Sequence, residues 1–180
     1  MDIVTFVGQS IGRWQSQRTA HHLTFRHSEE VQSTIDIEAV DQDHPDVAKL
    51  CESYGVAIAD IATPFRMTWE GESDWDEDEE EQQTLSGTTI LIPVPDKDNP
   101  RKGKLLRDQG YAETVAAAGE YHFTDDDTFV LVTSYDRAAA EEKIWFVNPN
   151  LRFRVSMIKT SSGTGVLTAS FASETRVQLA

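Results

Sequence analysis

The stretch that decides the fold runs from residue 143 to residue 156 and reads K-I-W-F-V-N-P-N-L-R-F-R-V-S. An Asn-Pro-Asn turn signal at 148–150 separates two runs rich in aromatic and β-branched residues, which predicts two strands joined by a tight turn. In the second run, apolar residues alternate with Arg152, Arg154 and Ser156. Because successive strand residues point to opposite faces, we expect these three polar side chains to share one face.

Similar runs recur along most of the chain, separated by Gly, Pro, Asn and Asp. Many strands with short links and without βαβ alternation predict an antiparallel sandwich or a closed barrel, an all-β fold of about ten strands. The strands are predicted near 13–26, 30–40, 63–71, 87–94, 103–109, 118–124, 128–136, 141–147, 151–159 and 165–177.

Two segments show helical periodicity instead. The first follows Asp2, a favourable N-cap, and repeats its apolar residues on one face before Gly12. The second starts at Pro45, a residue suited to the first helical position, and stops before Gly55. Both are predicted to be short helices that cover the sheet. A length of 180 residues fits one domain over 1–180.

Composition excludes several classes of partner. The formal net charge of −15 disfavours nucleic acid and anionic membranes, because both are bound mainly through Lys and Arg. No apolar run is long enough to span a bilayer and the first residues do not resemble a signal peptide, so a cytoplasmic protein is expected. A single cysteine, Cys51, allows no intrachain disulfide and is expected to be a buried packing thiol.

Metal binding is also not expected. His21 and His22 form the one suggestive pair, but neighbours on a strand point to opposite faces and cannot readily share an ion. Either histidine could instead act as a proton donor near neutral pH.

The candidates for a binding site are arginines and tryptophans. The sequence has no nucleophile elbow, Walker loop, dinucleotide fingerprint or zinc-protease helix. Strand arginines beside aromatic walls would suit an extended, partly apolar anionic ligand. The alternative is that the arginines lie on a solvated outer face and the tryptophans in the core. These candidates are Arg18, Arg152, Arg154, Trp14, Trp69, Trp75 and Trp145.

Two further features carry charge. Glu174 and Arg176 share a face of the last predicted strand; an internal Glu174 could pair with an arginine or accept from a pyrrole-type N–H, whereas an external one would form an ordinary surface pair. Six consecutive carboxylates at 76–81 are interpreted as a self-repelling hairpin tip rather than a cation site.

Longer motifs resemble the S-type phycobiliprotein chromophore lyases, the CpcS/CpeS family, along nearly the whole chain. In chain order the matching stretches are S-I-G-R-W-Q-S-Q-R-T-A-H-H-L, C-E-S-Y, M-T-W-E-G, D-W-D, L-L-R-D-Q-G-Y-A-E, E-E-K-I-W-F-V-N-P-N-L-R-F-R-V-S and A-S-F-A-S-E-T-R.

The resemblance implies a lipocalin-like, or fatty-acid-binding-protein-like, antiparallel β-barrel of ten strands with helical cover. It implies a lyase that binds a linear tetrapyrrole, phycocyanobilin or a related bilin, and attaches it through a thioether to a cysteine of a phycobiliprotein subunit. Acceptors of the phycocyanin, allophycocyanin or phycoerythrin type are expected, and a homodimer is possible. The bilin propionates would be the anions for Arg152 and Arg154.

Residue by residue, the resemblance also implies a site. Glu142 and Glu174 would hold the protonated pyrroles, and His21 and His22 are kept as catalytic candidates. The bilin-binding residues would be Arg18, Trp69, Trp75, Trp145, Arg152, Arg154 and Ser156.

Two other functions stay open from the sequence. The same barrel could carry a bilin or a fatty acid and release it unchanged, since arginines and aromatic residues in a barrel are typical of small-molecule binders. The chain could also be an assembly factor that contacts only phycobiliprotein subunits.

Overall fold

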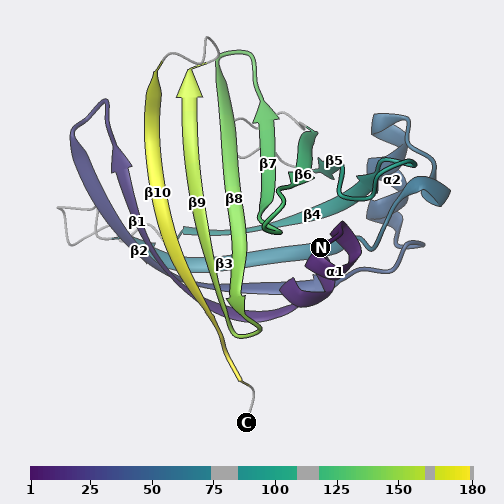
Figure 1. The fold of residues 1–180 in the computed structure, drawn as a ribbon, viewed down its shortest axis with the longest axis horizontal. Coiled ribbons are helices and arrows are strands. Elements are labelled where there is room, and N and C mark those ends of the chain that lie inside the picture. Colours follow the sequence, from purple (N-terminus) through teal and green to yellow (C-terminus); the bar gives the residue numbers. More distant parts are fainter. Residues whose placement is uncertain (74–84, 109–117, 161–164, 179–180) are drawn as a thin grey trace.

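The strands close into one antiparallel barrel in the computed structural model, which describes residues 1–73, 85–108, 118–160 and 165–178 (Figure 1). The order around the barrel is β1-β10-β9-β8-β7-β6-β5-β4-β3-β2, so each strand pairs with its neighbours in sequence and β10 closes onto β1. The elements are α1 (Ile3–Ser10), β1 (Gly12–His22), β2 (His27–Ala39), α2 (Pro45–Tyr54), a 3-10 turn η1 (Ile58–Asp60), β3 (Phe65–Ser73), β4 (Leu85–Pro95), β5 (Lys102–Arg107), β6 (Gly119–Phe123), β7 (Phe129–Ser134), β8 (Ala138–Asn148), β9 (Leu151–Thr160) and β10 (Val166–Arg176).

This architecture confirms the predicted all-β barrel and its ten strands. The largest difference in bounds is at the first hairpin, where β1 ends at His22 rather than near residue 26. The chain turns there through a hydrogen bond from the Phe25 N–H to the His22 carbonyl, and Arg26 has a φ of 52°, outside the range of a strand. Alternation alone did not reveal this turn, because it contains no Gly, Pro or Asn.

Helix α1 fills one end of the barrel (Figure 1). It is capped by the Asp2 carboxylate, which accepts a hydrogen bond of 2.9 Å from the Thr5 N–H. Its buried residues include Phe6, whose ring stacks on Phe129 at 4.3 Å between centroids. This end of the barrel is therefore closed by an aromatic core to which inward-facing strand residues contribute.

Helix α2 packs on the outside of the barrel. Pro45 occupies its first turn and Gly55 ends it with a φ of 64°, as the sequence predicted. Its buried residues contact outward-facing residues of β4 and β5 in a second core cluster, of which Cys51 is a buried member. A single domain over residues 1–180 stays a prediction. Within the described ranges, no helix is long and apolar enough to cross a membrane.

Candidate functional site

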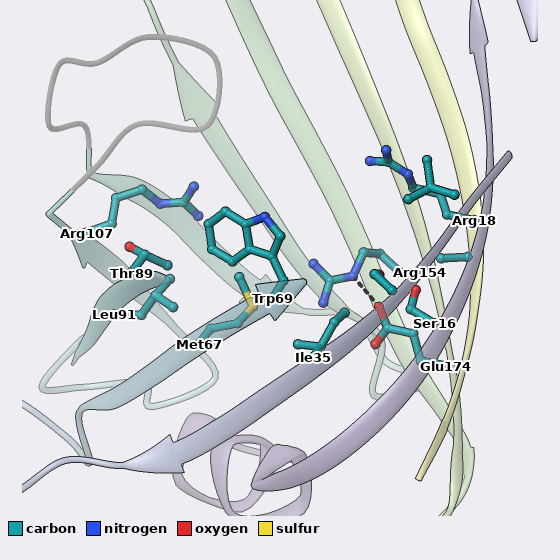
Figure 2. A pocket seen from close by; sticks show the side chains of 13 residues that line it. Ser16, Arg18, Ile35, Met67, Trp69, Thr89, Leu91, Arg107, Arg154 and Glu174 are labelled. Carbon is teal, nitrogen blue, oxygen red and sulfur yellow. Dashed lines mark hydrogen bonds and ion pairs between the residues drawn. The ribbon is translucent and has the colours of Figure 1, made fainter. Parts of the chain in front are cut away.

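The half of the barrel interior that lies away from α1 contains a cavity of about 340 Å³ (Figure 2). Every second residue of each strand points inside the barrel. One strand can therefore contribute residues to the aromatic core at one end and to the cavity lining at the other. The lining combines apolar side chains with three arginines and one carboxylate: Ser16, Arg18, Val31, Ser33, Ile35, Met67, Trp69, Thr89, Leu91, Arg107, Arg154, Ala172 and Glu174.

A network of two arginines and two glutamates forms one side of this cavity. Arg154 donates from Nε to Glu174 at 3.0 Å and from Nη1 to Glu142 at 3.1 Å, and Arg152 donates from Nε to the other oxygen of Glu174. The Ser156 hydroxyl lies 3.5 Å from Glu142. Pairing across the sheet explains the cluster, because Glu174 stands opposite Arg152 and Glu142 stands opposite Ser156. The expectation that Arg152, Arg154 and Ser156 share one face is confirmed, and this face is directed to the barrel interior, as the resemblance implied.

The charges in this network keep each other ionised. Burial alone would raise the pKa of Glu174, but the positive charges of Arg154 and Arg152 outweigh burial and hold that pKa below its ordinary value. Burial lowers the pKa of Arg152 to about 10, which still leaves the guanidinium protonated at neutral pH. The cavity lining therefore contains an ionised carboxylate, Glu174, beside a protonated guanidinium, Arg154.

Arg152 lies beneath the cavity wall rather than on its surface, and this corrects the expectation that it meets a ligand. Its side chain is 1% exposed, and its guanidinium stacks on the Trp14 ring at 4.4 Å from the centroid. Arg176 stacks on the same ring at 4.2 Å. Arg152 thus supports Glu174 from behind, while Glu174 itself lines the cavity.

Trp69 stands in the middle of the cavity, with the guanidiniums of Arg107 and Arg154 on opposite sides of its indole in Figure 2. It pairs across the sheet with Gly87, and a Cβ at that glycine would lie 2.2 Å from Trp69 Cζ2. The bare backbone of Gly87 therefore lets the indole lie flat over β4. No sequence motif pointed to this pairing.

A second polar cluster lies at the open end of the barrel, where β1 and β2 meet. Glu29 is buried and accepts hydrogen bonds from Ser73 at 2.6 Å, while its other oxygen lies 2.8 Å from His22 Nε2. The guanidinium of Arg18 is 4.0 Å from the same carboxylate. Burial raises the pKa of Glu29, but the hydrogen bonds from Ser73 and His22 and the charge of Arg18 more than offset it and lower the pKa overall.

The two histidines are separated by the barrel wall. His22 belongs to the inward-facing set of β1, whereas His21 is exposed on the outer face and lies 2.8 Å from the Ser28 hydroxyl. The expectation that these adjacent strand histidines point to opposite faces is therefore confirmed.

Trp145 is on the outer face, and its predicted place in the pocket is wrong. It follows inward-facing Ile144 in β8 and packs on Phe153 at 5.7 Å between ring centroids. Phe153 in turn contacts Phe171. The sequence could have shown this, because Trp145 has the opposite parity to Glu142 on the same strand. Trp75 and the acidic run 76–81 lie outside the described residues.

Sequence reasoning missed two buried charged residues. Arg107 ends β5 and is 5% exposed, and Glu29 near the start of β2 is 7% exposed. Arg107 follows Leu105 with the same parity, so the inward face of β5 was the signal that could have identified it. Together with Glu174 and the Trp69 indole, Arg107 makes the cavity suitable for a ligand that has a planar body, an anionic group and N–H donors.

Comparison with known proteins gives close matches. A relative from Trichodesmium erythraeum (strain IMS101), named chromophore lyase CpcS/CpeS 3, is 60% identical over 98% of this chain and 99% of its own length. A putative phycoerythrobilin lyase CpeS from Microchaete diplosiphon is 56% identical over 89% of this chain and 71% of its own. The phycocyanobilin lyase subunit CpcS from a Picosynechococcus species is 40% identical, over 98% and 87%.

Solved structures agree with these matches. The S-type phycobiliprotein lyase CPES from Guillardia theta superposes with a TM-score of 0.84 at 44% identity, covering 100% of this chain and 95% of that one. Rv2717c from M. tuberculosis has a TM-score of 0.55 at 11% identity over 97% of each chain, a likeness of fold alone. The sequence model described as CpeS-like protein matches residues 2–177, and the chain therefore belongs to the CpeS-like protein family.

Proposed function

We propose that this protein is a chromophore lyase that binds a bilin and attaches it covalently to a cysteine of a phycobiliprotein subunit. The names of its relatives support this activity. The structural observation that carries it is the cavity in which Arg154 and Glu174 lie on one side of Trp69 and Arg107 on the other. A bilin has an extended conjugated body, two propionates and pyrrole N–H groups, and the cavity offers a partner for each.

The reaction adds a thiol across the ethylidene double bond of the bilin A ring. A sulfur–carbon bond forms at the ethylidene carbon, and the proton lost by the thiol ends on the tetrapyrrole, so no oxidant or reductant is needed. A free bilin is flexible and can react in several orientations. The barrel accelerates one outcome by holding the bilin extended, excluding water and presenting one end to the acceptor.

The carboxylates are proposed to hold the protonated pyrroles. Glu174 stays ionised because Arg154 and Arg152 lower its pKa, so it can accept from pyrrole N–H groups and stabilise positive charge on the bilin. Glu142 on β8, two strands away from Glu174, shares Arg154 with it and can serve the same purpose. His22, held by Glu29 at the open end, is a candidate proton donor for the thiol addition. His21 faces outward and is given no role.

The finer assignments remain proposals. Phycocyanobilin or a related bilin is the proposed substrate, and the relatives' names add phycoerythrobilin as a specific related case. Acceptor subunits of the phycocyanin, allophycocyanin or phycoerythrin type are proposed as well. A cytoplasmic location and a homodimer stay predictions.

A transfer assay tests this function. Apo-subunit and bilin are incubated with and without the protein, and the product is followed on a denaturing gel by zinc-enhanced bilin fluorescence. We expect a covalent band whose yield and absorption maximum depend on the protein. A carrier would bind bilin, as seen by absorption, without increasing covalent product, and an assembly factor would bind subunits but not bilin; either outcome would reject the proposal.

A further inference from the structure

The turn between β1 and β2 displays large apolar side chains to solvent. Leu23 is 51% exposed and Phe25 is 73% exposed, the highest value among the large apolar side chains of the described residues. The turn itself is ordered by the hydrogen bond of 3.1 Å from the Phe25 N–H to the His22 carbonyl and by the positive φ of Arg26. A defined turn therefore holds these two side chains in water, where they bury little apolar surface.

The start of β10 extends this apolar surface. The Leu23 N–H donates a hydrogen bond of 2.9 Å to the Leu167 carbonyl, so the two leucines are neighbours across the β1–β10 edge. Leu167 and the preceding Val166 are themselves exposed. We call Leu23, Phe25, Val166 and Leu167 the mouth patch. Contiguous exposed apolar residues of this kind mark interaction surfaces.

The charge around the mouth patch differs from that of the whole chain. Residues 19–28 contain no carboxylate, although the chain has 31 Asp and Glu residues and a net charge of −15. Arg26 and His21 are exposed in the same stretch. This surface is complementary to an apolar face with carboxylates around it. A second copy of the chain in a two-fold dimer would instead bring the mouth patch against itself and Arg26 near Arg26, so a different protein fits better.

The position of the mouth patch relative to the cavity indicates which protein this is. The inward-facing residues of β1 run from Ser16 and Arg18, which line the cavity, to His22 beside the turn. In Figure 1 the β1–β2 hairpin lies on the left, away from α1, and α1 with its aromatic core fills the other end. The paired strands close the wall between the two ends. A thiol that reacts with a bilin in this cavity therefore has to enter past the mouth patch.

We propose that the mouth patch docks the acceptor subunit, which rests on the proposed function and names the surface where that partner binds. Phe25 is the apolar anchor, since a large exposed ring contributes most when it enters a pocket of a partner. Arg26 meets carboxylates of the subunit. Docking here holds the acceptor cysteine at the open end, so the thiol addition gains in proximity without any contact between these residues and the bilin.

Binding of the subunit is measured separately from the reaction. The probe is the apo-subunit that the wild type modifies in the transfer assay, with its acceptor cysteine replaced by serine, and its Kd is measured by biolayer interferometry. Phe25→Ser and Leu23→Ser are compared with Val4→Ser, a variant at an equally exposed apolar residue of α1 at the closed end. We expect Phe25→Ser to weaken binding about tenfold, Leu23→Ser about threefold, and Val4→Ser to leave it unchanged. Bilin affinity should stay within about twofold in all three.

Kinetics and salt dependence sharpen the assignment. With the intact apo-subunit, Phe25→Ser should raise the KM for the subunit about tenfold and leave kcat within about twofold, because saturating subunit restores the complex. Arg26→Asn removes the charge but keeps a residue that tolerates a positive φ. It should weaken subunit binding at low salt and reduce the dependence of Kd on salt concentration.

Several outcomes would overturn the docking surface. An unchanged Kd in Phe25→Ser, or an equal loss in Val4→Ser, would show that the mouth patch is not the contact. Loss of bilin affinity in Phe25→Ser would place the turn in the bilin site instead. A wild-type dimer in sedimentation velocity that Phe25→Ser dissociates would assign the mouth patch to a second copy. A wild type that binds the cysteine-free subunit through this patch but transfers no bilin would reject the lyase function and leave the docking surface standing.

Discussion

The two halves of the barrel interior are built by the same strands and have opposite chemistry. In the half that α1 closes, Phe6, Phe129 and their neighbours form a dry aromatic core. In the open half, arginines and glutamates surround a cavity. On β1 the interior changes from apolar to polar between two successive inward-facing residues, the fully buried Trp14 and Ser16. A rigid apolar end therefore holds the register of the strands that position the charges.

The boundary between the two halves is the stack of Trp14 with two guanidiniums. Arg152 is buried against the ring and reaches Glu174, so it connects the core to the site. Arg176 also stacks on the Trp14 ring. It donates hydrogen bonds to the Ile11 and Pro149 carbonyls and so connects the end of α1 to the turn between β8 and β9. Changes in the core should alter stability first, whereas changes in the cavity should alter binding first.

The largest expected effect is on stability, from Phe6→Ala in the closed half. The Phe6 ring contacts Phe123, Phe129 and Phe146, and truncation leaves a cavity in a close-packed core. We expect a loss of about 3–5 kcal/mol in the free energy of unfolding, measured by urea denaturation. Bilin affinity of the folded fraction should stay within about twofold, because the residue does not line the cavity. A large loss of affinity at full folding would show that the halves are coupled.

Glu174→Gln should destabilise the boundary in a pH-dependent way. The carboxylate compensates the buried Arg152 and the partly buried Arg154, so its neutralisation should cost on the order of 3 kcal/mol at pH 7. Its pKa is lower in the folded protein than the ordinary 4.5, so its stabilisation is fully present above that value and is lost as the pH falls through the lower folded pKa.

Thermal unfolding of both proteins between pH 7 and pH 3 checks this sign. The difference between wild type and Glu174→Gln should shrink as the pH drops below about 4.5. A difference that stays constant with pH would show that shape rather than charge matters at this position.

Sequence reasoning predicted which residues share a face of a strand better than it predicted how deep a residue lies. The period of two correctly predicted that Arg152, Arg154 and Ser156 share one face, whereas the inward direction of that face and of Glu174 followed only from the family resemblance. It could not separate Arg152 from Arg154, which point the same way but lie at different levels of the barrel. That depth depends on which strands pair and in what register, and pairing is set by contacts far apart in sequence.

The errors at single residues have similar physical causes. Trp145 was assigned to the pocket by resemblance, although it has the opposite parity to inward-facing Glu142 on the same strand and therefore points outward. Arg107 was overlooked because β5 is short and carries charges on both faces. Gly87 was overlooked because the role of a strand glycine becomes clear only when its cross-strand partner, here Trp69, is known.

Gly87→Ala should therefore reduce binding more than stability. The added methyl group would collide with the Trp69 indole, which must turn out of its place across the cavity. We expect bilin affinity to fall about tenfold, measured by absorption titration, with the fluorescence of Trp69 shifted. Gly8→Ala is the matched control, since a Cβ at that exposed helical glycine meets nothing within 4 Å and should slightly stabilise α1. Equal affinities in both variants would argue against a stacking role for Trp69.

The smallest effect is expected from Cys51→Ala, outside both halves. Cys51 is buried under α2 with Val47 and Leu50, and burial raises the pKa of its thiol, which keeps the sulfur protonated and unreactive. The nucleophile in the proposed reaction belongs to the acceptor subunit, so transfer yield should be unchanged, while the free energy of unfolding should fall by only about 1 kcal/mol. Mass spectrometry of the protein after incubation with bilin provides a direct check. A bilin adduct on Cys51, or loss of transfer by a folded Cys51→Ala protein, would instead mean that this chain binds the chromophore covalently before transfer. The cavity would then be an entry site for the bilin and not the site at which the acceptor thiol reacts with it.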